Sequence, residues 1–201
     1  MALTESTMLA LSSPAPDFCL PNTSGGITSL SDFEEDKLLV VLFICNHCPY
    51  VIHIAPALAE LAKKYQDKGV GFVAINSNDT DTYPADNFDA MKKEREHRAY
   101  TFPYLFDDTQ EVAKAFSAAC TPDIYVFDSE RKLAYRGQFD TTRPHRISSG
   151  NYDSSKAQAT GESLACALDA LLKNDTLPEP QIPSVGCNIK WKDGNAPAYY
   201  G

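Results

Sequence analysis

Two cysteines, Cys45 and Cys48, are separated by two residues and lie between an apolar run and an amphipathic run. A Cys-x-x-Cys pair where a strand gives way to a helix is a known redox arrangement. The N–H groups and the positive dipole end of a helix N-terminus stabilise a thiolate, which we expect at Cys45. The spacing lets the sulfur of Cys48 attack a mixed disulfide formed by Cys45. The pair therefore predicts thiol–disulfide chemistry, with Cys45 as the nucleophile and Cys48 as the resolving thiol.

The elements on either side of this pair predict how it is positioned. Leu38 to Ile44 is wholly apolar and rich in β-favouring residues, as in a central strand buried on both faces. From about Pro49 to Lys68 apolar residues recur with helical spacing, and Pro56 is expected to kink this helix because proline lacks an N–H donor. Val70 to Ile75 is a second buried strand. A right-handed crossover between the two strands places the cysteines at the carboxyl end of the central strand.

The rest of the chain alternates between strand and helix patterns. Strands are expected over 15–21 and 27–30 as an N-terminal hairpin, and over 102–106, 123–127 and 132–138; helices are expected over 87–98, from about 109 to 119, and over 162–173. This order predicts an α/β fold with a central mixed sheet. We assign residues 1–173 to one domain, with a loosely held arm over 1–14 and a long polar loop over 139–161, and residues 174–201 to an extended C-terminal tail.

The composition is that of an ordinary globular protein, with 43% hydrophobic and 22% charged residues among 201. The net charge of −9 argues against nucleic-acid binding and against an anionic membrane surface. The N-terminal segment has neither a basic flank nor a long apolar core, so we expect no signal peptide, no membrane span and a cytoplasmic location. Thiols are kept reduced there, so most of the six cysteines are expected as thiols and not as a disulfide framework.

With these elements in place, the sequence resembles the thioredoxin superfamily, specifically its peroxiredoxin-like (redoxin) branch, over roughly residues 14–173. Ala15-Pro16-Asp17-Phe18 with Leu30-Ser31-Asp32-Phe33 resembles the N-terminal hairpin of that branch, and Cys45 to Cys48 resembles its redox pair. Ile54-Ala55-Pro56 resembles the kinked helix. Thr121-Pro122-Asp123-Ile124-Tyr125-Val126-Phe127-Asp128 resembles the cis-proline loop and the strand after it, and Lys132 to Gly137 resembles the closing strand. The resemblance implies a three-layer α/β/α sandwich with a central mixed sheet and an N-terminal β-hairpin extension. It also implies a cis peptide bond at Pro122, opposite the cysteine pair, where a substrate backbone can pair. Thr121, Pro122 and the preceding Cys120 are therefore expected beside the pair.

The sequence also departs from both patterns that it resembles. Thioredoxin has a buried acid six residues before its first cysteine, whereas Leu39 stands there in this chain, so no proton acceptor for Cys48 is identified. Pro56 lies three residues further from the second cysteine than in thioredoxin. Peroxiredoxins have a threonine three residues before the peroxidatic cysteine. Three residues before Cys45 this chain has Leu42, and three residues before Cys48 it has Cys45, so the threonine is missing in either alignment.

Three functions fit these residues. The first is a thiol–disulfide oxidoreductase that takes a protein or small-molecule disulfide or thiol as substrate and an external thiol as reductant. The second is a thiol-dependent peroxidase, in which one cysteine of the pair reacts with peroxide and passes through a sulfenic acid; the absent threonine counts against it. The third is a metal-binding or metal-delivery protein that uses Cys45, Cys48 and either Cys120 or His53. The first interpretation is preferred; it needs no cofactor and no metal, and it leaves the oligomeric state open.

Other residues have a chemical and a structural interpretation. His47 either stabilises the neighbouring thiolate, which makes the disulfide easier to reduce, or faces solvent. Cys120 is a third redox thiol, a metal ligand or, slightly favoured, a packing residue, as Cys19 and Cys166 are. Cys187 lies in a motif-like stretch of the tail and reaches the site only if the tail docks. A solvated surface position is expected for His53, Arg136, Arg143, His145 and Arg146.

Overall fold

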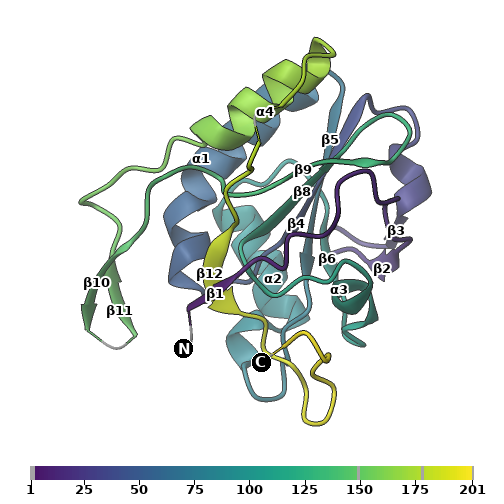
Figure 1. Cartoon of the computed structure of the whole chain (residues 1–201). Coiled ribbons are helices and arrows are strands. Elements are labelled where there is room, and N and C mark those ends of the chain that lie inside the picture. The colour runs from purple at the N-terminus through teal and green to yellow at the C-terminus, as the bar shows by residue number, and fades with distance from the viewer. Residues whose placement is uncertain (1–2, 149, 178, 201) are drawn as a thin grey trace.

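The structure is a computed structural model that describes residues 3–148, 150–177 and 179–200. Its centre is a five-stranded sheet in the order β6-β5-β4-β8-β9 (Figure 1). The strands are β4 (Leu38–Phe43), β5 (Val70–Asn76), β6 (Tyr104–Phe106), β8 (Asp123–Phe127) and β9 (Leu133–Arg136). β4 pairs parallel with β5 and antiparallel with β8, so the predicted mixed sheet is confirmed.

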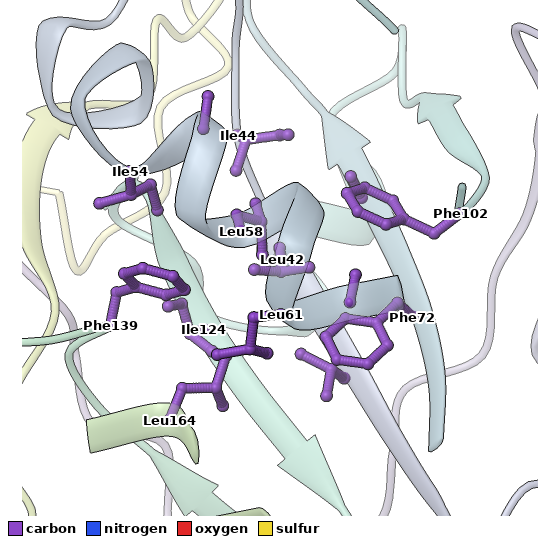
Figure 2. Packing of buried hydrophobic residues seen from close by; sticks show 14 of the residues in the cluster. Leu42, Ile44, Ile54, Leu58, Leu61, Phe72, Phe102, Ile124, Phe139 and Leu164 are labelled. Atoms are coloured by element: carbon purple, nitrogen blue, oxygen red, sulfur yellow. The ribbon is translucent and has the colours of Figure 1, made fainter. Parts of the chain in front are cut away.

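Two hydrophobic clusters form the layers on either side of this sheet. Alternate residues of each strand point to opposite faces, so Leu42 of β4 belongs to one cluster and Val41 to the other. Helices α1 (Pro49–Gln66) and α4 (Glu162–Leu172) cover the first face, where Ile54 and Leu58 pack beside Leu42 (Figure 2). Helix α3 (Glu111–Ala115) covers the second face. The three-layer α/β/α arrangement that the resemblance implies is therefore present.

The remaining elements extend this sandwich. The predicted N-terminal hairpin consists of β2 (Cys19–Pro21) and β3 (Ile27–Ser29), and the charged helix α2 spans Phe88–His97. Two short 3-10 helices lie in connections: η1 (Leu30–Phe33) between β3 and β4, and η2 (Pro84–Asp86) between β5 and α2. Helix α3 is shorter than predicted, because its sequence after Ala115 turns through a left-handed residue at Ser117.

A second, three-stranded sheet joins the two ends of the chain. Strand β1 (Leu3–Glu5) pairs with β12 (Val185–Asn188), and β12 pairs with β7 (Cys120–Thr121) (Figure 1). The loosely held arm predicted over residues 1–14 is therefore wrong for β1. β1 forms because the docked tail supplies a hydrogen-bonding partner, which local sequence patterns do not reveal.

The composition of the polar segment 139–161 predicts a loop, but the structure shows regular secondary structure within it. It contains an antiparallel hairpin of β10 (His145–Ser148) and β11 (Asn151–Asp153), which projects from the body of the molecule (Figure 1). His145 and Arg146 are exposed on it, as expected. Within the described part of the chain, no helix combines the length and apolar character needed to cross a membrane.

We expect Leu42→Ala to lower the free energy of unfolding by about 2–5 kcal/mol, because the Leu42 side chain is completely buried between β4 and α1 and its truncation leaves a cavity. Denaturant titration measures this loss. Leu3→Ala is the matched control, since Leu3 is 64% exposed and its truncation should cost no more than about 0.5 kcal/mol. Equal losses for the two variants would contradict the packing described here.

Candidate active site

The cysteine pair lies in the connection between strand β4 and helix α1. β4 ends at Phe43 and α1 begins at Pro49, so Cys48 occupies the N-cap position of the helix, where its backbone is extended. The helix begins at Pro49, where the amphipathic run predicted it, so its N-terminus lies at the second cysteine and not at the first, where the thiolate was expected. A helix that starts at the second cysteine in place of the first is displaced by three residues, which is the displacement that Pro56 shows.

Thr121 contacts both sulfurs of the pair. In its thiol form the Cys48 Sγ donates to the Thr121 carbonyl oxygen at 3.1 Å, and the Cys45 Sγ lies 3.6 Å from the Thr121 Oγ1. The Thr121–Pro122 peptide bond is cis, the geometry that the resemblance implies. Thr121 and Pro122 therefore lie beside the pair as predicted, although they come from a segment more than seventy residues away.

The local environment favours a thiolate at Cys48. Burial raises the pKa of this thiol, but hydrogen bonds from the Cys187 and Cys45 thiols, the Thr121 side chain and the Val51 backbone N–H outweigh it and hold the pKa well below its usual range. The Val51 N–H belongs to the first turn of α1, where N–H groups lack helical partners. The helix N-terminus thus acts on the second cysteine.

The environment of Cys45 has the opposite effect. Burial, a hydrogen bond with Cys48 and the negative charge of Asp86 raise the Cys45 pKa well above its usual range, and a hydrogen bond from Thr121 offsets only part of the increase. These directions favour a thiolate at Cys48 over the one that was expected at Cys45.

The carboxylate of Asp86 holds the loop that contains the pair. Its Oδ1 accepts hydrogen bonds from the backbone N–H groups of Asn46, at 2.8 Å, and His47, at 3.4 Å. Its Oδ2 accepts from the Asn78 side-chain amide at 2.8 Å. Asp86 is completely buried, and the next residue back, Ala85, accepts a further hydrogen bond from the Asn46 side chain at 2.8 Å. Sequence reasoning missed this residue, which lies in η2, forty residues beyond the pair.

The His47 side chain points to Asp86, although part of it is exposed to solvent. Its Nδ1 lies 2.6 Å from the Asp86 Oδ2, and its ring stacks on Tyr83 with the centroids 5.5 Å apart. The imidazole therefore contacts the acid that holds the loop, and its effect on the neighbouring thiolate stays a prediction.

Two other predicted residues are buried, one against expectation and one as expected. His53 is buried, not solvated: its Nε2 lies 2.8 Å from the Thr142 Oγ1, and burial lowers its pKa. Cys120 is buried on β7 and donates to the carbonyl oxygens of Pro122, at 3.5 Å, and Ser184, at 3.9 Å. These contacts favour the packing interpretation of Cys120.

The C-terminal tail reaches the pair. Strand β12 places Cys187 opposite Thr121 in the β12–β7 register, and the Cys187 thiol is hydrogen-bonded to that of Cys48. The edge of β7 at which a substrate backbone was expected to pair is thus occupied by the protein's own tail. Docking of Cys187 depends on backbone pairing between distant segments, which the motif-like stretch signalled only weakly.

A metal is poorly accommodated by these residues. Within the described ranges, the ligand atoms that gather are those of Cys45, His47 and Asp86, all within 4.8 Å of one another, and not the predicted set with Cys120 or His53. The His47 Nδ1 and Asp86 Oδ2 are 2.6 Å apart, closer than two ligands on a tetrahedral ion whose bonds are about 2.0–2.1 Å. The oxygens of Asp86 already accept hydrogen bonds, so the arrangement suits an anchored loop.

Comparisons with known proteins agree with this site. The AhpC/TSA family matches residues 11–136. A crystal structure of an uncharacterized conserved protein from Geobacillus kaustophilus is 50% identical, covers 96% of this chain and 97% of that chain, and has a TM-score of 0.88. The thiol-disulfide oxidoreductase ResA of Geobacillus thermodenitrificans is 29% identical over 130 residues, which are 65% of this chain and 70% of that protein.

A more distant structure identifies the fold. The thioredoxin domain of a thiol-disulfide oxidoreductase from Bacteroides vulgatus is 22% identical, covers 64% of this chain and 88% of that chain, and has a TM-score of 0.55. The chain therefore has a thioredoxin-like fold, as its sequence predicted. Cys187 lies beyond the segment that the family matches.

We expect Asp86→Asn to lower the pKa of Cys45, because the substitution removes a negative charge that disfavours the Cys45 thiolate. The pH dependence of Cys45 alkylation, followed by mass spectrometry in a Cys48→Ser background, measures this shift. Asp89→Asn is the control, since Asp89 is exposed on α2. An unchanged alkylation midpoint in the Asp86 variant would contradict the electrostatic role.

A buried acid on β8 predicts a pH effect on stability. Asp123 lies opposite Phe43, accepts from the Ala119 N–H at 3.2 Å and the Tyr125 hydroxyl at 3.0 Å, and has its pKa raised by burial from 3.8 to about 6. A raised acid pKa stabilises the fold below the unfolded value, and this stabilisation is lost as the pH rises through the folded value. We therefore expect Asp123→Asn to abolish a decline of about 3 kcal/mol between pH 4 and pH 7.

Denaturant titrations at several pH values test this expectation. Asp175→Asn, at an exposed position, should leave the pH dependence of the unfolding free energy unchanged. A parallel decline in wild type and Asp123→Asn would show that another group causes it.

Proposed function

Because this chain belongs to the AhpC/TSA family, we propose that it is a thiol–disulfide oxidoreductase whose reactive sulfur is Cys48 and whose resolving sulfur is Cys45. The observation that carries this proposal is the position of Cys48 at the N-cap of α1, where hydrogen bonds hold its pKa well below the usual range. The relation to ResA supports the same reaction class. The chain is an oxidoreductase of the thioredoxin fold.

The reaction consists of two exchanges between sulfur atoms. The Cys48 thiolate attacks one sulfur of a substrate disulfide, and the other half of the substrate leaves as a thiolate. Cys45 then attacks the Cys48 sulfur, its proton passes to a departing substrate sulfur, and the second half of the substrate is released. The protein now holds a Cys45–Cys48 disulfide and the substrate has gained two electrons. An external thiol reductant restores the pair.

Both sulfurs are covered, so the substrate enters only after a movement. Cys45 is 2% exposed and Cys48 is fully buried. A nearby cavity, lined by residues such as Tyr50, Pro122 and Val185 but by neither cysteine, has a volume of about 20 Å³, room for about one water molecule. A transient displacement of β12 opens a route to the sulfurs, because this strand pairs with Thr121, and its return brings Cys187 back to Cys48. Such opening of a covered site is common in enzymes.

The test is capture of a mixed disulfide at Cys48. We expect a variant with Cys45→Ser and Cys187→Ser to accumulate disulfide-linked partners in cells, because both substitutions remove thiols that contact Cys48 and release the substrate. Non-reducing electrophoresis and mass spectrometry detect the partners. Adding Cys48→Ser to the same variant should abolish it, and equal capture without Cys48 would overturn the proposal.

Peroxide consumption distinguishes the alternative function, a thiol-dependent peroxidase, from the proposed oxidoreductase. We infer peroxidase activity only if the reduced protein consumes hydrogen peroxide, with a thiol reductant, far faster than free cysteine does, and Cys48 passes through a sulfenic acid. Protein or small-molecule disulfides remain the proposed substrates. A cytoplasmic location, where an external thiol reductant is present, also remains a proposal.

A further inference from the structure

Strand β12 is held firmly over the redox pair by contacts on both sides of Cys187. Before it, the Ser184 Oγ donates to the Gly137 carbonyl at 2.6 Å, and the Ser6 N–H donates to the Ser184 carbonyl at 2.9 Å. After it, the buried Ile189 donates its N–H to the Ala119 carbonyl at 3.1 Å. Cys187 therefore has a defined place in the fold, although it belongs to a tail rich in proline.

The following residues anchor the tail further. The Lys190 N–H donates to the Asn78 Oδ1 at 2.8 Å, and its carbonyl accepts from the Asp79 N–H at 2.7 Å and from the Gln110 side chain at 2.9 Å. Asn78 also donates to Asp86. The same buried network thus positions the loop with Cys48 and the strand with Cys187.

Gly186 allows the close approach of this strand. A methyl group on its α-carbon would lie 2.0 Å from the Thr121 carbonyl oxygen, so no larger residue fits without moving β12 or β7. That same oxygen accepts the hydrogen bond from Cys48. Glycine therefore brings the Cys187 backbone against the segment that contacts the reactive sulfur.

Cys187 is itself buried against that sulfur. Its side chain is 3% exposed, and its hydrogen bond with Cys48 is among the contacts that stabilise the Cys48 thiolate. Cys48 thus has two thiol neighbours, Cys45 from its own loop and Cys187 from β12. A thiol that donates to a thiolate is also the nearest nucleophile once that thiolate has formed a mixed disulfide.

We infer that Cys187 is a third redox thiol, which β12 delivers to Cys48 and which forms an intramolecular Cys48–Cys187 disulfide. This inference rests on the proposed function and names a second thiol able to resolve the intermediate on Cys48. The ligand class is unchanged: a protein or small-molecule disulfide.

The electrons and atoms balance as follows. The Cys48 thiolate attacks a substrate disulfide and forms a mixed disulfide, releasing one substrate thiolate, which takes the Cys187 proton. The Cys187 thiolate attacks the Cys48 sulfur, the bond between Cys48 and the substrate breaks, and the second substrate thiolate is protonated from solvent. The substrate is reduced by two electrons, and the protein is oxidised by two electrons to the Cys48–Cys187 disulfide. An external thiol reductant regenerates both thiols.

The test uses the full chain in a background with Cys19→Ser and Cys166→Ser, which removes the two exposed thiols. To this background we add Cys45→Ser, so that Cys48 retains Cys187 as its thiol neighbour, and treat the protein with dithionitrobenzoate, an aromatic disulfide whose thiolate is coloured. We expect two equivalents of coloured thiolate per chain, no retained adduct, and a Cys48–Cys187 peptide by mass spectrometry. Adding Cys187→Ser should leave one equivalent released and the adduct retained on Cys48.

Each outcome has a distinct meaning. A Cys48 adduct that persists while Cys187 is present overturns the inference but leaves the reactivity of Cys48, and hence the proposed function, in place. Failure of Cys48 to react at all overturns both. Cys120→Ala is the matched control, since Cys120 is equally buried beside β12 but donates to carbonyl oxygens; it should leave the Cys48–Cys187 peptide unchanged.

Gly186→Ala provides a second variant that alters no thiol. Because the added methyl group displaces β12 from Thr121, we expect release of the second equivalent to slow at least tenfold while the first is unchanged or faster. Unchanged release of the second equivalent would contradict delivery of Cys187 by β12.

Discussion

The buried carboxylate of Asp86 is the contact on which the geometry of this site depends. Its oxygens accept two backbone N–H groups of the Cys-x-x-Cys loop and the side chain of Asn78, which also holds the tail. A buried charge is costly unless hydrogen bonds surround it, and each charge-assisted bond contributes about 1.5–3 kcal/mol. Because one acid connects the loop and the tail, a shift of Asp86 disturbs every sulfur around Cys48. The same charge also disfavours a thiolate at Cys45, and so adds to the order, Cys48 before Cys45, in which the two thiols ionise.

The two cysteines differ in their order of ionisation because their environments differ. Cys48 lies where α1 begins and receives a backbone hydrogen bond from Val51, whereas Cys45 lies beside a carboxylate. Identical side chains, three residues apart, therefore have opposite shifts in pKa. The surroundings of each sulfur, and not its order in the motif, give the two cysteines these opposite shifts.

The parts of the fold that sequence patterns predict are those with local signals. β4 is apolar at every position because both faces of the sheet are covered, and the apolar stripe of α1 has helical spacing. The amphipathic run predicted the start of α1 near Pro49, where the helix begins, and the position of Pro56 agreed with that start. The sequence did not show which cysteine the helix N-terminus would stabilise, because the five residues that connect the two elements include both cysteines. Asp86 was missed because it is one acid among 27 acidic residues, in a polar segment far from the pair. Cys187 depends on pairing of a four-residue strand with distant partners, for which short strands carry little signal.

The meeting of both chain ends over the cysteines has a consequence for the order of synthesis. β4, α1 and β7 all leave the ribosome before β12, which comes from residues 185–188. Until those residues emerge, the nascent chain has neither the strand that pairs with Thr121 nor the thiol that donates to Cys48. Docking of β12, and not formation of the central sheet, is therefore the step that completes this redox centre.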